Sequence, residues 1–325
     1  MKLLTYKINN LDTPQIGVLQ NQLVYNLNNC FGNISLVELI QIDDYQDQVA
    51  AFICNEDCLN HDIEDITVLP TIPKPNSFRD AYAFRQHVST SRKNRGVDMI
   101  PEFDEFPVFY FSNHNAMFAD KETIELMPDH FHRLDYELEF AIVIGKGGKN
   151  ILSKDADNHI AGFCILNDLS ARRLQLEEMK LNLGPSKGKD FANIIGPYLV
   201  TSDELEAKSI DTTFGKKYDL KMQCFVNGEL LSEGNTKDMN WTFAEIIERA
   251  SYGVELFPGD VIGSGTVGTG SLLELNGSGK RANPDYEVRW IQDGDEIEMQ
   301  IEGLGKITNK IVKLDTNHSI LKLKK

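Results

Sequence analysis

The sequence contains few cysteines, and they show no pairing pattern. Five of the 325 residues are cysteine: Cys30, Cys54, Cys58, Cys164 and Cys224. An odd number of widely spaced thiols argues against the disulfide framework of a small secreted domain. Cys54 and Cys58 lie close in sequence, but no second cysteine pair accompanies them to complete a zinc site. We therefore expect idle or buried thiols and a cytoplasmic protein.

Long apolar runs and an excess of basic residues are also missing. No apolar segment approaches the ~20 residues needed to span a bilayer, and the first residues, MKLLTYKINN, lack the apolar region of a secretory signal. Lys and Arg number 33 against 49 Asp and Glu, which gives a formal net charge of −16. Nucleic acids and anionic membranes both favour basic patches, so we expect neither as a partner. An anionic small molecule remains compatible with this charge, because a bound cation and a few basic side chains can reverse the sign inside a cleft.

The chain lacks repeats and low-complexity tracts, and its length allows more than one unit. Residues 1–70 contain short strand-like segments, and the proline-rich residues 69–75 (LPTIPKP) are typical of a stiff linker. We predict a small N-terminal β-rich domain over residues 1–70 and a catalytic domain over residues 71–325. Strand patterns and short helices dominate the second part, which indicates an α+β, mostly β fold and not alternating βα units.

Turn and capping signals predict several local elements. The Asn-Gly pair at residues 227–228 predicts a hairpin. Thr242 and Glu245 form a T-x-x-E capping box that should open a helix. Ser153 and Ser170 are candidate N-caps of two short helices.

Two further stretches are predicted as strands. Residues 106–112 (FPVFYFS) are typical of a buried strand. The glycine-rich stretch that starts at residue 257 lacks the G-x-G-x-x-G spacing before a helix, so we expect a strand, a glycine loop and another strand. In that second strand Glu274 would point away from the face of Leu273 and Leu275.

The most informative pattern is an alternating strand over residues 136–144. Apolar side chains would occupy one face, and Glu137 and Glu139 would lie about 7 Å apart on the other. Adjacent carboxylates repel each other unless a positive group lies between them, and a cation is the simplest candidate. Asp168 ends a second apolar run, residues 162–166, and could add a third carboxylate from a neighbouring strand.

Basic residues follow these carboxylates in the sequence. Arg172 and Gln175 are three apart on one face of a predicted helix, near its electropositive N-terminus, which suits an anion. Lys187 and Lys189 lie on a glycine-flanked loop. The basic residues 92–95 could attract an anionic substrate, although solvated loop charge is the commoner explanation of such a run.

The order of the motifs resembles the fumarylacetoacetate hydrolase family. Between residues 78 and 275 the chain contains R-D-A-Y-x-x-R-Q-H, P-V-x-Y, D-Y-E-L-E-F-A, N-D-L-S-A-R-x-x-Q, G-K-D-F, P-G-D-x-x-x-S-G-T and G-S-L-L-E-L. The resemblance implies a mixed β-sandwich roll with a small N-terminal domain, and a homodimer. It also implies a divalent cation, Mg²⁺ or Ca²⁺, held by Asp80, Glu137, Glu139 and Asp168. Four carboxylates without a soft ligand do suit a hard, oxygen-preferring ion.

The resemblance further implies hydrolysis of a carbon–carbon bond in a β-diketo acid, such as fumarylacetoacetate to fumarate and acetoacetate in tyrosine catabolism. In such enzymes a histidine activates water and a glutamate orients it; the matching residues are His87 and Glu274. Groups that stabilise the oxyanion match Arg172, Gln175 and Lys189, and Lys189 could also protonate the leaving carbanion. The substrate-contacting positions match Tyr82, Tyr110 and Thr266, with an arginine of residues 92–95 for a substrate carboxylate.

An alternative is a 2-oxo acid lyase, hydratase, isomerase or decarboxylase on the same scaffold. Decarboxylase and acylpyruvase relatives carry Y-x-x-H-x-x-E on a flexible lid. Here Tyr82 and His87 are five apart, and Thr90 occupies the position three after His87. The lid dyad is therefore missing, which favours the hydrolase branch. A non-catalytic metal-binding protein is a third hypothesis.

Overall fold

The structure, a computed structural model, describes residues 1–8, 13–54 and 58–321 and is built around two β-sheets. The larger sheet has 12 strands. Ten of them follow the order β4 (Asn60–Asp62), β3 (Leu23–Asn26), β2 (Gln15–Gln20), β1 (Lys2–Ile8), β15 (Asn193–Val200), β13 (Ile160–Asp168), β11 (Leu138–Ile144), β21 (Val261–Gly263), β6 (Phe78–Ala81) and β7 (Phe109–Ser112). The other two are β5 (Ile66–Val68), which pairs with β1, and β8 (Met117–Phe118), which pairs with β15.

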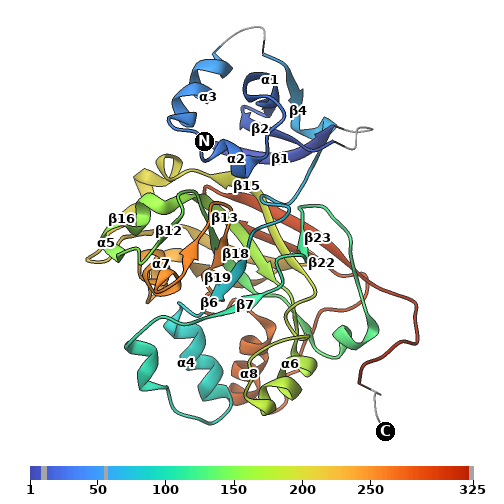
Figure 1. The fold of residues 1–325 in the computed structure, drawn as a ribbon. Coiled ribbons are helices and arrows are strands. Elements are labelled where there is room, and N and C mark those ends of the chain that lie inside the picture. The colour runs from blue at the N-terminus through green and yellow to red at the C-terminus, as the bar shows by residue number, and fades with distance from the viewer. Residues whose placement is uncertain (9–12, 55–57, 322–325) are drawn as a thin grey trace.

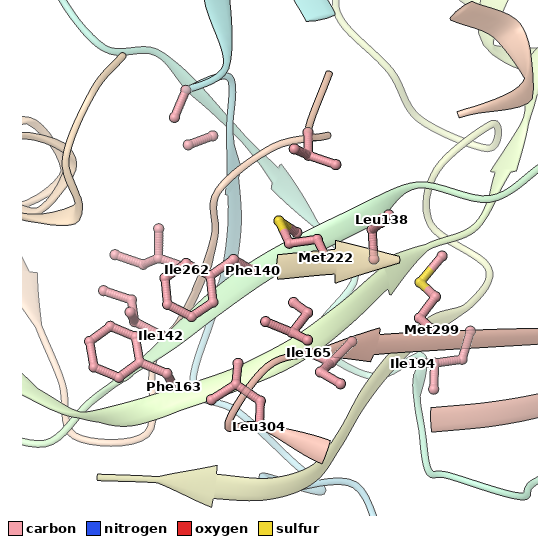
Figure 2. Packing of buried hydrophobic residues seen from close by; sticks show 14 of the residues in the cluster. Leu138, Phe140, Ile142, Phe163, Ile165, Ile194, Met222, Ile262, Met299 and Leu304 are labelled. Atoms are coloured by element: carbon pink, nitrogen blue, oxygen red, sulfur yellow. The ribbon is translucent and has the colours of Figure 1, made fainter. Parts of the chain in front are cut away.

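A second sheet of five strands packs across one face of the larger sheet. Its order is β19 (Glu229–Asn235), β18 (Lys221–Val226), β22 (Glu296–Ile301), β23 (Gly305–Lys313) and β9 (Ile124–Leu126). Figure 2 shows the core between the sheets, where Phe140, Phe163 and Ile194 of the larger sheet meet Met222 and Met299 of the smaller one. The rings of Phe140 and Phe163 stack with their centroids 5.1 Å apart. This layering confirms the predicted mixed β-sandwich.

Short helices and two-stranded ladders surround the sandwich. The helices are α1 (Asn28–Phe31), α2 (Leu36–Leu39), α3 (Tyr45–Ile53), α4 (Arg85–Asn94), α5 (Ser153–Ala156), α6 (Arg172–Glu178), α7 (Phe243–Ser251) and α8 (Leu272–Ala282). The ladders pair β10 (Leu134–Asp135) with β14 (Ser170–Ala171), β12 (Gly148–Lys149) with β20 (Glu255–Leu256), and β16 (Ser209–Asp211) with β17 (Lys216–Tyr218). In Figure 1, α1, α2 and α3 lie at one end of the molecule, and α4, α6 and α8 lie at the other. No helix among the described residues is long and apolar enough to cross a membrane.

The N-terminal strands continue the larger sheet instead of forming a sheet of their own. Lys2 and Leu3 of β1 pair antiparallel with Val200 and Leu199 of β15. Apolar residues of α2 and β1 also cover the face of β11 and β13 opposite the second sheet. The two parts thus share one sheet and a second core layer. The domain boundary at residue 70 stays a prediction.

Several local predictions are confirmed. The hairpin of β18 and β19 turns at Asn227 and Gly228, both with positive φ (51° and 79°), as a two-residue turn between twisted strands requires. The capping box of α7 is complete: Thr242 Oγ1 accepts from the Glu245 backbone N–H at 3.2 Å, and Glu245 Oε2 accepts from the Thr242 backbone N–H at 2.8 Å. Both segments fold locally as their sequences dictate.

The two serine caps and the buried strand were predicted wrongly. Helix α5 begins at Ser153, with Leu152 at the N-cap position, and Ser170 belongs to β14 because α6 starts only after Ala171. Residues 109–112 do form a strand, but β7 is the edge of the larger sheet and Phe111 is 64% exposed. A run of aromatic residues indicates a strand without telling how many neighbours it has.

The second strand predicted after the glycine loop is in fact helix α8. Ser271 is its N-cap and accepts from the Glu274 backbone N–H at 3.3 Å, so Ser-Leu-Leu-Glu is an S-x-x-E start signal. Gly277 and Gly279 weaken the helical pattern that follows, which explains why the signal was overlooked. Glu274 is only 2% exposed and takes part in the site described below.

Thr242 caps helix α7, whereas Ser153 caps no helix, and this difference should appear in the stability of the protein. We expect Thr242→Ala to lower the free energy of unfolding by about 1 kcal/mol, because it removes a side-chain acceptor for an otherwise unsatisfied helical N–H. Ser153→Ala is the matched control, because the Ser153 hydroxyl caps no helix; its effect should stay below about 0.5 kcal/mol. Denaturant unfolding of the two variants provides the comparison, and equal losses would contradict it.

Candidate active site

A cavity of about 730 Å³ lies where β6, β7, α4, α6 and α8 meet. It brings together most of the residues singled out in the sequence. Those that line it are Asp80, Tyr82, His87, Tyr110, Glu137, Arg172, Gln175, Lys189 and Thr266. Glu139, Asp168 and Glu274 do not line the cavity, but each contacts a residue that does. Elements far apart in the chain therefore converge on one space.

Three carboxylates form a buried group beside this cavity. Asp80, Glu139 and Asp168 each offer an oxygen within 4.8 Å of the others. They come from β6, β11 and β13, and β21 runs between β11 and β6. Gly263 of β21 leaves room for them, because a Cβ there would lie 2.5 Å from Asp80 Oδ1 and 3.0 Å from Glu139 Oε2. The Gly265 backbone N–H donates to both of these oxygens at 3.1 Å.

The chemistry of this group fits a hard divalent cation. Burial, together with the neighbouring Asp168 carboxylate, raises the pKa of Asp80 to about 7. Burial and Asp80 likewise raise the pKa of Glu139. Within the described chain, the buried Asp168 Oδ1 has no hydrogen-bond partner. Buried carboxylates of this kind need a compensating charge, and three oxygen donors with no soft ligand suit Mg²⁺, Ca²⁺ or Mn²⁺.

Glu137 lies next to this group but contacts cationic side chains. Arg172 Nη2 donates to Glu137 Oε1 at 2.7 Å, and Lys189 Nζ donates to Glu137 Oε2. Burial would raise the pKa of Glu137, but Arg172 and Lys189 outweigh it and hold the pKa well below its usual range. Lys189 Nζ also donates to Asp168 Oδ2 at 2.5 Å, so it links Glu137 to the three carboxylates. A role of Glu137 as a metal ligand stays a prediction.

A histidine–carboxylate pair lies across the cavity on two packed helices. His87 of α4 and Glu274 of α8 are joined by a 2.6 Å hydrogen bond between Nδ1 and Oε2, and both are buried. The Thr269 backbone N–H also donates to Glu274 Oε2, at 3.0 Å, and holds the carboxylate in place. A carboxylate on Nδ1 fixes the tautomer in which Nε2 carries the lone pair. His87 lines the cavity, so Nε2 is its free basic atom there.

Arg172 makes a network that the sequence only partly predicted. Its Nη1 donates to Gln175 Oε1 at 3.0 Å, and its Nε donates to Asp135 Oδ2 at 2.7 Å. Burial opposes the charge of Arg172, but Glu137 and Asp135 raise its pKa, so the guanidinium stays charged. Asp135 was overlooked, although it extends by two residues the alternating face that carries Glu137 and Glu139.

The rim of the cavity is basic. Arg95, Arg133 and Lys280 line it, and none of them forms an ion pair with a described residue. Of the basic residues 92–95, Arg95 is the arginine in the lining, whereas Arg92 donates to the Asp98 carbonyl. Arg133 and Lys280 had no signal in the sequence, because only the fold brings them to this rim.

The carboxylate group predicts a metal effect that depends on pH. We expect Mg²⁺ or Mn²⁺ at 100 times its dissociation constant to add about 2.7 kcal/mol to the stability of the protein at pH 8. Because Asp80 holds a proton below its pKa of about 7, the cation must displace that proton, so the gain should shrink between pH 7 and pH 5. Thermal melting with and without chelator measures it. Asp168→Asn should abolish the gain, and Asp157→Asn, a control remote from the cavity, should keep it.

The chain resembles known proteins in both sequence and fold. Residues 76–312 match the family described as fumarylacetoacetate (FAA) hydrolase C-terminal. An uncharacterised protein of Staphylococcus epidermidis is 29% identical over 331 residues, which cover 96% of this chain and 100% of that protein. A fumarylacetoacetate hydrolase from psychrophilic Exiguobacterium antarcticum is 25% identical with a TM-score of 0.71, covering 97% of this chain and 100% of its own.

Two more distant structures share the fold. Maleylpyruvate hydrolase from Sphingobium sp. SYK-6, in complex with manganese(II) and pyruvate, has a TM-score of 0.71 at 19% identity, covering 96% of this chain and 99% of its own. A 5-carboxymethyl-2-hydroxymuconate delta-isomerase from Mycobacterium smegmatis has a TM-score of 0.68 at 21% identity. The match covers 97% of this chain and 100% of the isomerase. The fold thus accommodates both hydrolases and isomerases.

Proposed function

From the premise that the chain belongs to the fumarylacetoacetate hydrolase family, we propose that it hydrolyses a carbon–carbon bond in a β-diketo acid, with fumarylacetoacetate as the first candidate. The observation that carries this proposal is the buried His87–Glu274 pair, whose histidine lines the same cavity as Asp80 of the carboxylate group. Hydrolysis needs an activated water, and a histidine oriented by a carboxylate is suited to that task. Family membership alone would leave hydrolase and isomerase equally open.

The first step is proton removal from water. His87 Nε2 accepts the proton, and the water oxygen forms a bond to the carbonyl carbon of the substrate. Glu274 stabilises the imidazolium through its 2.6 Å bond to Nδ1, so that the charge on His87 is compensated as it appears. An imidazole is effective in this role because it can accept a proton from water and return it within one reaction cycle.

The second step is stabilisation of the tetrahedral oxyanion. Arg172, Gln175 and Lys189 line the cavity from α6 and the loop after it, and they provide the donors. Arg172 and Lys189 are buried and charged, so their attraction to an oxyanion is weakly screened. Both side chains are already charged and oriented before substrate binds. Their partners are the carboxylates of Asp135, Glu137 and Asp168.

The third step breaks the carbon–carbon bond. The electron pair of the tetrahedral centre reforms the carbonyl, and the leaving carbon takes a proton from Lys189. The proton held by His87 then replaces the one that Lys189 gave, and the new carboxylic acid ionises. One water is consumed, and for fumarylacetoacetate the products are fumarate and acetoacetate. A divalent cation, bound by Asp80, Glu139 and Asp168 and, as we propose, Glu137, would supply Lewis-acid polarisation of the substrate oxygens.

The basic rim and the manganese complex of a relative support two details of this proposal. An acid substrate needs cationic partners, and Arg95 is positioned to contact a substrate carboxylate at the rim. The maleylpyruvate hydrolase of the same fold binds manganese(II) and pyruvate, which supports a divalent cation and a 2-oxo acid for this chain. We propose Mg²⁺ or Ca²⁺ as the native ion.

The test is a direct assay of the full-length protein with fumarylacetoacetate and Mg²⁺. The decrease in diketone absorbance would measure turnover, and mass spectrometry would identify the products. Fumarate and acetoacetate would support the proposal. The second candidate is isomerase or decarboxylase chemistry, which the likeness to the delta-isomerase favours; turnover of oxaloacetate or an acylpyruvate, with fumarylacetoacetate unchanged, would transfer the function to that class.

A further inference from the structure

Asp135 belongs to a row of three acidic residues that alternate along the chain with Tyr136 and Leu138. It lies in β10, opposite Ser170 of β14, and is completely buried. It does not line the cavity, so it cannot contact a substrate there. Burying a carboxylate destabilises a protein unless its oxygens accept hydrogen bonds. Both oxygens of Asp135 do so, from the start of α8 and from Arg172, two elements that line the cavity.

One set of contacts ties Asp135 to the start of α8. Its Oδ1 accepts from the Leu272 backbone N–H at 2.7 Å, and its Oδ2 accepts from the Leu273 N–H at 3.0 Å. The third N–H of the helix, that of Glu274, is taken by Ser271 Oγ. Helix N-termini leave these groups without partners inside the helix, so Asp135 and Ser271 together satisfy the first turn of α8.

This arrangement frees the Glu274 carboxylate. In the capping boxes of α2 and α7 the third helical residue, Glu38 or Glu245, folds its carboxylate back to the N-cap backbone N–H. Glu274 occupies the same position in α8, yet its carboxylate bonds to His87. Asp135 and Ser271 accept from the first three N–H groups of α8, so these groups have acceptors without the Glu274 carboxylate.

The second set of contacts fixes Arg172. Asp135 Oδ2 accepts from Arg172 Nε at 2.7 Å, and Arg172 Nη2 lies 2.7 Å from the same oxygen. This pair orients the guanidinium so that Nη1 reaches Gln175 and Nη2 reaches Glu137. The planar guanidinium has a fixed donor geometry, so one bond at Nε determines where the other nitrogens point.

We infer that Asp135 is a positioning residue that couples the His87–Glu274 base to the Arg172 oxyanion donor. The inference rests on the proposed function, since it assigns those two roles. A single buried carboxylate caps the helix that presents Glu274 and orients Arg172, which lines the cavity from α6. The general base and the oxyanion donor are thereby held at a fixed distance and orientation. The reaction needs this because the water that His87 activates attacks the carbonyl group whose oxygen Arg172 stabilises.

Asp135→Asn is the decisive variant. The amide keeps one acceptor oxygen, so Arg172 loses one of its two negative partners and keeps Glu137, and one N–H of α8 loses its acceptor. We expect kcat to fall about 100-fold with KM changed less than about threefold, because Asp135 does not touch substrate. The double variant Asp135→Asn/Glu274→Gln should lose less activity than the product of the two single losses, because part of the Asp135 effect acts through Glu274 and part through Arg172.

A spectroscopic measurement tests the coupling without turnover. In protein labelled with ¹⁵N at its seven histidines, the Nδ1–H of His87 should give a downfield resonance, assigned with His87→Gln. Asp135→Asn should shift or abolish it. Asp129→Asn is the matched control: Asp129 is also buried and accepts from the Ile320 N–H at 2.7 Å and from Ser319 Oγ at 2.8 Å, but it neither lines the cavity nor bonds to Arg172 or α8. The control should leave the resonance unchanged.

The outcomes separate this inference from the proposed function. An unchanged His87 resonance in folded Asp135→Asn, or an equal change in Asp129→Asn, would overturn the positioning role. A specific change in a protein that does not hydrolyse fumarylacetoacetate would keep the coupling and reject the proposed reaction. If Asp135→Asn does not fold, Asp135→Glu keeps the charge but displaces it; a smaller, same-direction shift of the resonance is then expected, and no shift would count against the role.

Discussion

Replacing His87 by alanine is expected to lower kcat by about 10³-fold while leaving metal binding intact. Loss of a general base removes two to four orders of magnitude from the rate, because the water must then be deprotonated by solvent. His87 is bonded to Glu274 and not to the buried carboxylates, so the cation site keeps all its ligands. Steady-state kinetics with fumarylacetoacetate and titration calorimetry with Mn²⁺ would measure the two properties separately.

Two companion variants sharpen this result. Glu274→Gln should lose less than His87→Ala, since the imidazole remains but its charged form lacks a partner. His114→Ala changes a histidine that does not line the cavity and should leave kcat unchanged. If His87→Ala retained wild-type turnover, His87 would not be the base and hydrolysis by this route would be excluded.

Replacing Lys189 by methionine should affect stability and catalysis together. Lys189 is 4% exposed and donates to both Glu137 and Asp168, and despite its burial these carboxylates raise its pKa. Methionine has a similar shape but no charge. Removing one partner from a buried ion pair costs about 3–5 kcal/mol, because the carboxylates stay buried without compensation. The loss of an oxyanion donor should also reduce kcat by about 10²–10³-fold.

Lys187→Met is the matched control. Lys187 lies two residues earlier on the same loop, its side chain is 54% exposed, and it pairs with Asp190. A solvent-exposed pair contributes little, so its removal should cost less than about 1 kcal/mol. Denaturant unfolding in chelator would show the contrast. Divalent cation should restore part of the stability of Lys189→Met, since it supplies the missing positive charge; equal effects of the two substitutions would contradict a specific role for Lys189.

How far the sequence predicts this molecule depends on how local each signal is. The alternation of β11 is confirmed: Leu138, Phe140 and Ile142 face the core between the sheets, whereas Ala141 and Val143 face the second core layer on the opposite side. The capping box of Thr242 and the turn at Asn227 are equally local, and both are confirmed. The glycine loop concealed α8, because Gly277 and Gly279 reduce helix propensity within a helix that tertiary contacts stabilise.

The candidate site was predictable only in part for a similar reason. The carboxylates could be found because Glu137 and Glu139 are two apart in sequence, with Glu137 just before β11 and Glu139 within it, and Asp168 ends the neighbouring strand. The contribution of Asp135 depends on α8, which is more than 130 positions away in sequence and reaches it only through the fold. Lys280 and Arg133 reach the rim in the same way. No pattern within one segment encodes such convergence.

The pairing of β1 with β15 limits how the catalytic part can be studied by itself. A fragment without residues 1–70 would lose the strand that covers the end of β15 at Leu199 and Val200. It would also expose apolar side chains of the larger sheet, including Leu166 and Ile195, which α2 and β1 now cover. Unpaired strand edges beside apolar surface promote pairing between separate copies. We therefore expect such a fragment to aggregate even with every cavity residue present, because its exposed sheet edge and apolar face would pair with other copies.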